Sequence, residues 1–207
     1  MKSQKQKLLL IVSGTLWLAA VAVGLWILFR YENTPGLAAA SPEFWPVESN
    51  VKRTQDRSTL IMLAHPHCPC TRASLGELDL LMAECQGLIN AHVIFIRPEG
   101  FTDEWPRTDL WQSAAAIPGV TVRQDDGGIE ARRFNAETSG QVLLYDATGR
   151  LLFSGGITSS RGHSGDNAGR SAIVSLLTTA GITGINQTPV FGCALFNESC
   201  TSQTQEP

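Results

Sequence analysis

The first apolar segment of the chain is also its longest. Residues 8–29 contain no charged side chain, and a helix of that length, at ~1.5 Å per residue, crosses a hydrocarbon core of ~30 Å. Lys2, Lys5 and Lys7 precede this segment, and Arg30 is the one basic residue close behind it. This basic excess predicts an N-terminus in the cytoplasm and a translocated remainder. We therefore predict a single-pass helix in a bacterial cytoplasmic membrane.

The same segment is long for a cleavable signal peptide, whose apolar core has ~7–15 residues. A small-residue pattern at residues 38–40 would nevertheless allow cleavage after Ala40. An uncleaved anchor is favoured, and cleavage is the alternative. In both cases the remainder lies in the periplasm or another extracytoplasmic space, where disulfides persist.

Beyond residue 50 the apolar pattern changes between strand and helix periods. Residues 58–64 are almost entirely apolar, as in a strand covered on both faces. Apolar residues then recur at helical spacing over 70–85, and a second strand rich in branched and aromatic residues spans 91–96. Three shorter elements are expected next: a helix over 108–115, a strand over 119–122 and a helical turn over 129–134.

A hairpin and a final helix complete the pattern. Two short β-like runs, 141–145 and 150–154, are separated by Asp-Ala-Thr-Gly, which predicts a turn between antiparallel strands. Asp166 or Asn167 then caps a helix. The order β-α-β, an irregular helical region and β-β-α predicts an α/β fold, a central mixed sheet with flanking helices.

The domain organisation follows from these elements. Residues 1–31 form the cytoplasmic tip and membrane anchor, and residues 32–49, rich in Pro, Ala and Ser, form a linker. Residues 50–184 form one compact domain, and residues 185–207 a cysteine-containing tail.

Charge and motifs exclude several functions. The net charge is −3 and no basic cluster lies outside the N-terminus, so nucleic-acid binding has no electrostatic support. No phosphate loop, dinucleotide fingerprint, nucleophile elbow or H-E-x-x-H motif occurs. Asp125 and Asp126 have no acid–base partner in the sequence and are expected in a solvated turn.

The densest chemistry lies between the first strand and its helix. Residues 65–70 are His-Pro-His-Cys-Pro-Cys. The unpaired N–H groups and the dipole of a helix N-terminus stabilise a thiolate over a thiol. A thiolate is the nucleophile of disulfide exchange and also a ligand of soft metals. The motif therefore indicates thiol redox chemistry or metal handling.

The element order and this motif resemble the thioredoxin superfamily. Its members place C-x-x-C at the N-terminus of the helix that follows a central strand, and the likeness covers roughly residues 50–182. The anchor, the motif, the hairpin and the C-terminal Thr-Pro-Val-Phe-Gly-Cys at 188–193 are also similar to membrane-anchored RedB-type proteins. The resemblance implies a thiol–disulfide oxidoreductase whose partner is a protein or small-molecule thiol or disulfide.

The sequence departs from the thioredoxin pattern at two places. The motif is one residue shorter, so Cys68 takes the attacking position when aligned from the strand, whereas His67 takes it when aligned from the helix. The family's cis-proline falls on Gly140, which implies altered substrate docking. Pro69 and Gly140 are therefore expected at the docking site, as is His163, whose loop lies beside the motif in this fold.

The redox interpretation assigns catalytic roles to four residues. A disulfide between Cys68 and Cys70 would close a strained, easily reduced ring, and His67 could act as a local base. Cys193 lies in an apolar segment that can return to the motif and resolve a mixed disulfide. The alternative is a structural bond between Cys193 and Cys200.

Metal binding is the rival interpretation. His65, His67, Cys68 and Cys70 are soft or borderline ligands, and thiolates favour Cu(I) or zinc. Pro66 disfavours the regular strand that would bring both imidazoles to one face. The redox interpretation requires no cofactor, whereas a metallochaperone-like protein would carry copper or zinc.

Overall fold

The computed structural model describes residues 2–178 and 186–196, and it separates the chain into two units, Met1–Thr34 and Pro35–Pro207. The first unit consists of α1 (Lys2–Glu32). Within the described residues it is the one helix that is long and apolar enough to cross a membrane, and a signal sequence would satisfy the same criterion. The expected apolar N-terminal helix is therefore confirmed.

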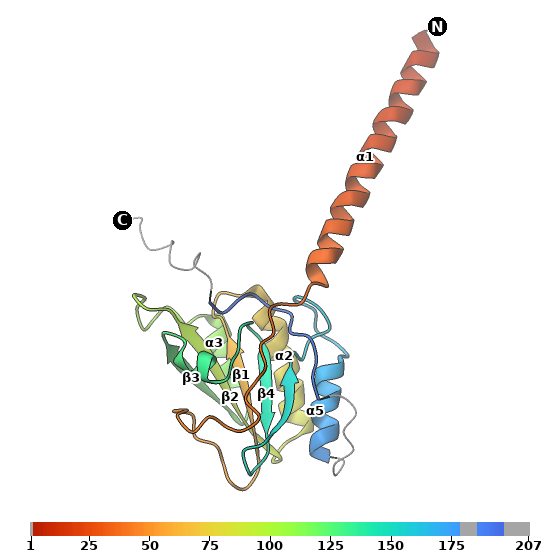
Figure 1. The fold of residues 1–207 in the computed structure, drawn as a ribbon. Coiled ribbons are helices and arrows are strands. Elements are labelled where there is room, and N and C mark those ends of the chain that lie inside the picture. The colour runs from red at the N-terminus through yellow and green to blue at the C-terminus, as the bar shows by residue number, and fades with distance from the viewer. Residues whose placement is uncertain (1, 179–185, 197–207) are drawn as a thin grey trace. The chain divides into compact units, whose positions relative to one another are not determined.

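The second unit contains a five-stranded mixed sheet (Figure 1) with the strand order β3-β2-β1-β4-β5. The parallel strands are β1 (Ser58–Ala64), β2 (Ile89–Arg97) and β3 (Val120–Asp126). The antiparallel strands are β4 (Gln141–Tyr145), which pairs with β1, and β5 (Leu151–Gly155), which pairs with β4. The predicted hairpin is confirmed.

Helices cover both faces of this sheet. They are α2 (Pro69–Glu84), α3 (Asp109–Ala116), α4 (Ile129–Arg133) and α5 (Ala168–Thr178). The helices α2, α3 and α5 contribute to the core on one face, and α4 contributes to the core on the other. The sequence prediction of a thioredoxin-like fold, a central mixed sheet with flanking helices, is confirmed.

The central strand β1 is apolar because both of its faces are covered. Leu60 and Met62 lie in the core beneath α2, whereas Ile61 and Leu63 lie in the opposite core. Successive strand residues point to opposite faces, so a strand buried on both sides needs an unbroken apolar run. This central strand delivers the cysteine motif at its carboxyl end.

The carboxyl end of β3 differs from expectation. Asp125 was expected in a solvated turn, but it is the penultimate residue of the strand and only 3% exposed. Its carboxylate accepts hydrogen bonds from the backbone N–H groups of Glu130 and Ala131, at 2.8 and 2.9 Å. Helix α4 begins there, and its first N–H groups have no partner within the helix. The prediction was wrong because these donors are backbone N–H groups five and six positions further along, and no side-chain pattern marks them.

The stretch between the anchor and β1, expected as a linker, contacts the domain from residue 36 onward, and its Trp45 packs on the core on the α4 face of the sheet, here called the second core. The Trp45 ring lies 5.2 Å from the ring centroids of both Phe134 and Tyr145. The Tyr145 hydroxyl donates to the carbonyl oxygen of Pro42 at 3.0 Å. Much of this stretch is therefore part of the domain's packing.

A buried carboxylate on α2 fixes the loop that precedes α5. Glu77 is fully buried and accepts from the Gly165 N–H at 2.7 Å and from Asn167 Nδ2 at 3.0 Å. It also forms an ion pair with Arg170 at 3.0 Å. Asn167 in turn accepts from the Arg170 N–H at 2.8 Å and so caps α5. Residues 165–167, which end this loop, are thereby held against α2.

Glu77→Ala should lower the free energy of unfolding by about 3–5 kcal/mol, because it leaves the Gly165 N–H and the buried Asn167 amide without their acceptor and removes the buried partner of Arg170. Glu84→Ala is the control, since Glu84 pairs with the same Arg170 at 2.7 Å but is 47% exposed. Its loss should stay below about 1 kcal/mol. Urea titrations of the whole chain in detergent, followed by near-ultraviolet circular dichroism, measure both. Equal losses would contradict the assignment.

Candidate functional site

The cysteine motif occupies the turn from β1 into α2. Cys68 is the N-cap of α2 and Pro69 opens the helix. Proline is well suited to the first helical position because it lacks an N–H that would have no partner there. The Thr71 N–H donates to the Cys68 carbonyl oxygen at 3.1 Å. The Cys68 side chain is thereby placed at the positive end of the helix.

Cys193 lies beside Cys68, although 125 positions separate them. Their sulfur atoms are 2.8 Å apart, and the Cys193 N–H also donates to the Cys68 sulfur at 3.4 Å. A covalent bond would have a length of about 2.05 Å, so these are two thiols in contact. The apolar C-terminal segment therefore does return to the motif. Cys200, the alternative partner, lies outside the described residues.

The proton distribution between the two sulfurs is uneven. The hydrogen bond from the Cys193 thiol is the largest cause that lowers the pKa of Cys68 to about 5, against the opposing effect of burial. The backbone N–H of Cys193 and the Thr71 hydroxyl also lower it. The same hydrogen bond raises the pKa of Cys193. The thiolate therefore resides on Cys68 and the proton on Cys193.

Cys70, in the first turn of α2, stays protonated beside this pair. It is 6% exposed, and burial, followed by the negative charge of Cys68, raises its pKa. The Arg161 guanidinium acts in the opposite direction on the pKa of both Cys70 and Cys193. It also donates to the Gly192 carbonyl oxygen. Sequence reasoning missed Arg161; the sole signal for it was its place in the same loop as His163.

The two histidines of the motif differ in environment. His65 is 6% exposed, and burial lowers its pKa, which favours the neutral ring. Its Nδ1 accepts the His67 N–H at 3.2 Å. His67 is exposed, and its ring lies 4.6 Å from that of Trp105, which also contacts His65 at 5.4 Å. Trp105, which sequence reasoning also missed, thus forms an aromatic rim beside the motif.

The segment entering β4 is fixed against the motif. The Ser139 hydroxyl accepts the His65 N–H at 2.8 Å and lies 2.8 Å from the Thr71 hydroxyl oxygen. Gly140 follows with φ of +87°, and its N–H donates to Leu63 O at 2.8 Å. No cis peptide occurs among the described residues. Glycine is favoured here for two reasons. The backbone lies in the left-handed region, and an added Cβ would lie 2.8 Å from the Ser74 hydroxyl oxygen.

His163, one of the predicted docking residues, makes a contact within its own loop. His163 is exposed, and its Nδ1 lies 2.8 Å from the Arg161 carbonyl oxygen within its own loop. Within residues 2–178 and 186–196, no three or more His, Cys, Asp or Glu side chains are grouped so as to hold a metal ion. The alternative ligands of the motif are thus not gathered into such a group.

Cys193→Ala should raise the pKa of Cys68 from about 5 toward its ordinary value of 9.0, because the largest cause of the depression is removed. Ultraviolet absorbance of the thiolate, titrated on the reduced chain, measures this change. Cys85→Ala is the control, since Cys85 lies in the core. An unchanged pKa in Cys193→Ala would contradict the assignment.

The same pKa makes stability depend on pH. The Cys68 thiolate stabilises the reduced fold above pH 9.0, and this contribution disappears as the pH falls toward 5. The slope of the unfolding free energy against pH between 5 and 9.0 should therefore be smaller in Cys193→Ala, as urea titrations at several pH values would measure.

No family model and no curated protein matches the chain. A solved structure of an uncharacterized conserved protein from Geobacillus kaustophilus is 19% identical, with a TM-score of 0.57, over 79% of this chain and 92% of that one. A hypothetical protein, SMc02350, from Sinorhizobium meliloti 1021 is 20% identical, also with a TM-score of 0.57, over 78% of this chain and 93% of that one. Both likenesses concern the fold alone. The chain has a thioredoxin-like fold whose cysteine motif begins α2.

Proposed function

We propose that this chain is a membrane-anchored thiol–disulfide oxidoreductase whose domain acts in the periplasm or an equivalent space. The observation that carries the proposal is the Cys68 sulfur, placed at the start of α2 and 2.8 Å from the Cys193 sulfur. The direction of the shared proton leaves a thiolate on Cys68 at neutral pH. A thiolate with a second thiol in contact is the minimal equipment for disulfide exchange.

The first step is attack by the Cys68 thiolate on one sulfur of a partner disulfide. A bond forms between Cys68 and that sulfur, the partner's own S–S bond breaks, and its other sulfur leaves as a thiolate that takes a proton from water. His67 is exposed at the rim of the motif and is the candidate donor or acceptor of that proton. Pro69, Gly140 and His163 remain the predicted docking residues.

The second step is attack by Cys193 on the Cys68 sulfur. Once Cys68 is in a mixed disulfide it carries no charge, so the main cause that raises the Cys193 pKa is gone. Cys193 loses its proton to the departing partner sulfur. The mixed disulfide breaks, the partner leaves as a thiol, and a disulfide between Cys68 and Cys193 remains. Two electrons have passed from the dithiol to the partner, and a dithiol reductant restores the chain.

Cys70 supplies a second resolving thiol. It lies in the first helical turn after Cys68, and its raised pKa holds it as a thiol while Cys68 is charged. We assign the first resolving role to Cys193 because of the 2.8 Å contact between the two sulfurs. We further propose that the chain is a RedB-type protein, because its short C-P-C motif is similar to theirs.

We propose that the N-terminal helix is an uncleaved membrane anchor. Residues 1–31 form the cytoplasmic tip and single membrane pass, residues 32–49 the connection, residues 50–184 the catalytic domain and residues 185–207 the tail that carries Cys193. An uncleaved anchor predicts that protein extracted from membranes has the mass of the whole chain. Intact-mass spectrometry tests this, and a chain beginning at Ser41 would indicate a cleaved signal instead.

Cys68→Ser should reduce the rate of insulin reduction by the chain to the rate without protein, because it removes the nucleophile. Cys193→Ser should slow turnover and accumulate a mixed disulfide between Cys68 and the substrate. Cys70→Ser should retain more activity than Cys193→Ser. Turbidity assays and mass spectrometry of alkylated chains measure these outcomes, and Cys85→Ala is the control.

A redox-inactive chain would contradict the proposal. Full activity in the double variant Cys68→Ser/Cys70→Ser would do the same. Iodoacetamide titration across pH, with and without Cu(I), separates the metal-carrier alternative. Absent reductase activity together with protection of the thiols by Cu(I), lost on replacing His67 or Cys70, would favour that alternative.

A further inference from the structure

The C-terminal segment pairs with the backbone just ahead of β4. We call residues 190–196 the strap and the backbone of residues 137–139 the docking edge. The Ser139 N–H donates to the Cys193 carbonyl oxygen at 2.8 Å, and the Leu195 N–H donates to the Glu137 carbonyl oxygen at 2.9 Å. Thr138 and Ala194 form the antiparallel bridge between these bonds. The strap is therefore added to the domain as an extended strand.

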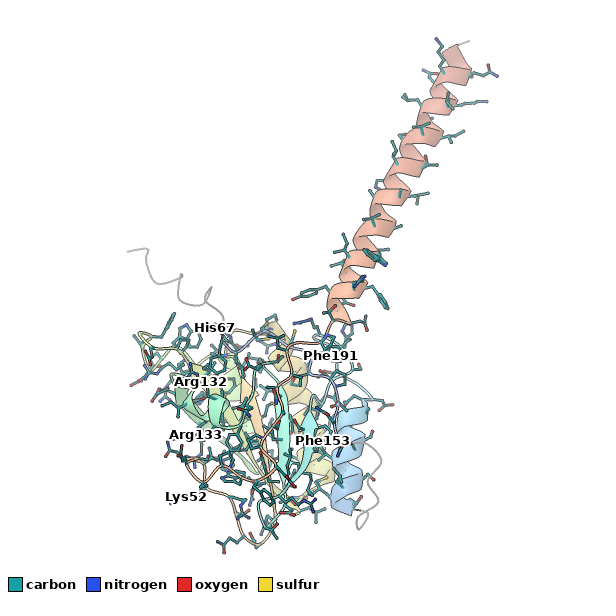
Figure 2. The ribbon with its side chains drawn as sticks, in the orientation of Figure 1. Lys52, His67, Arg132, Arg133, Phe153 and Phe191 are labelled. Carbon is teal, nitrogen blue, oxygen red and sulfur yellow. The ribbon has the colours of Figure 1, made fainter. Side chains whose placement is uncertain are left out.

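The strap is held by packing on both sides of this pairing. Val190 is 3% exposed, and its carbonyl oxygen accepts the Gly36 N–H at 2.8 Å. Leu195 is 2% exposed and belongs to the second core. The Phe196 ring lies under the Arg132 guanidinium, 4.6 Å from its centroid. In Figure 2, Phe191 of the strap and His67 of the motif lie toward one end of the domain and Lys52 toward the other.

Gly192, the residue before Cys193, passes so close to the backbone of Ser139 that only glycine fits there. A Cβ at Gly192 would lie 1.9 Å from the Ser139 carbonyl oxygen, a distance that no side chain tolerates. The obstructing atom is backbone, so it cannot rotate away. Any segment that follows the strap's path along the docking edge therefore needs glycine immediately before its cysteine.

The strap occupies the place where a substrate sulfur must react. Cys68 is 1% exposed, and the Cys193 sulfur lies in contact with its sulfur at 2.8 Å. The Cys193 N–H is also directed at the Cys68 sulfur. A partner disulfide reaches Cys68 after this contact opens. The partner and the strap thus compete for one position.

We propose that the docking edge receives an extended, cysteine-containing segment of a protein partner, and that the strap is an internal substitute for that segment. The inference rests on the proposed function. The partner adds as an antiparallel strand through the same two backbone bonds. Its pattern is Gly-Cys-x-apolar, in which the glycine passes Ser139 O and the apolar side chain takes the place of Leu195. When the strap docks again, Cys193 attacks the Cys68 sulfur, and the partner's cysteine is expelled as a thiol that takes up the Cys193 proton.

The test uses the whole reduced chain in detergent and a peptide of residues 188–196, Thr-Pro-Val-Phe-Gly-Cys-Ala-Leu-Phe. The peptide cysteine is first converted to a mixed disulfide with thionitrobenzoate. Attack by Cys68 on the peptide sulfur releases the coloured thiolate, whose absorbance gives the rate. A second peptide, with alanine in place of its glycine, is the matched probe.

The rates are compared above pH 9.0, where Cys68 is a thiolate with or without the hydrogen bond from Cys193. There Gly192→Ala should raise the reaction rate with the glycine peptide by about tenfold or more, because reactivity scales with the fraction of chains whose edge is open. Gly76→Ala is the control, since an added Cβ there would come no closer than 3.8 Å to the Ser164 hydroxyl oxygen. The alanine peptide should react about tenfold more slowly, because its Cβ meets Ser139 O as it would in the strap. If Gly192→Ala does not fold, Phe196→Ala loosens the same strap at its end, and the same comparison applies.

A small symmetrical aromatic disulfide distinguishes the two proposals, because it needs no docking edge. No reaction of Cys68 with it in the loosened variants would overturn the proposed function. Fast reaction with it, together with equal rates for the glycine and alanine peptides, would overturn the docking edge and leave the oxidoreductase in place. Equal rates with the glycine peptide in Gly192→Ala and Gly76→Ala would also overturn the docking proposal.

Discussion

The proton shared by the sulfurs of Cys68 and Cys193 is the interaction on which the site depends. A buried thiolate is unfavourable unless hydrogen bonds stabilise its charge. Cys68 is almost fully buried, yet its pKa falls to about 5 because the Cys193 thiol and N–H and the Thr71 hydroxyl all donate to it. The strap is therefore part of the nucleophile's environment. The helix terminus alone does not account for the thiolate.

The sheet explains why these donors meet. β1 is central and buried on both faces, so its carboxyl end delivers the motif at a fixed place beside the segment that enters β4. On the α2 side, the buried Glu77 holds the loop that carries Arg161. On the other side, the Ser139 hydroxyl and N–H contact His65 and Cys193 respectively. Three remote parts of the chain thus converge on one sulfur.

The fold was predictable from the sequence because its main elements carry strong local patterns. The apolar run of β1, the helical spacing of α2 and the Asp-Gly turn of the hairpin each identify their element. The predicted strand ended at residue 122, whereas β3 continues to Asp126. Because β3 is an edge strand, its last residues, Arg123 to Asp126, can be polar and give no apolar signal. Arg161 and Trp105 were missed because single exposed-type residues in loops become meaningful only once folding brings them to the motif. The return of Cys193 was predicted, but its preference for Cys68 depends on pairing with residues 137–139.

Tethering gives the strap a further consequence for partner choice. A group joined to its own binding site acts at a fixed effective concentration, on the order of millimolar for short connections, whatever the abundance of the protein. Under the proposed mechanism, a dilute free disulfide would seldom outcompete the strap. A partner that approaches within the same membrane plane, and therefore also meets the site at high local concentration, would compete on equal terms. The tethered strap would in this way favour partners held near the site over dilute solutes.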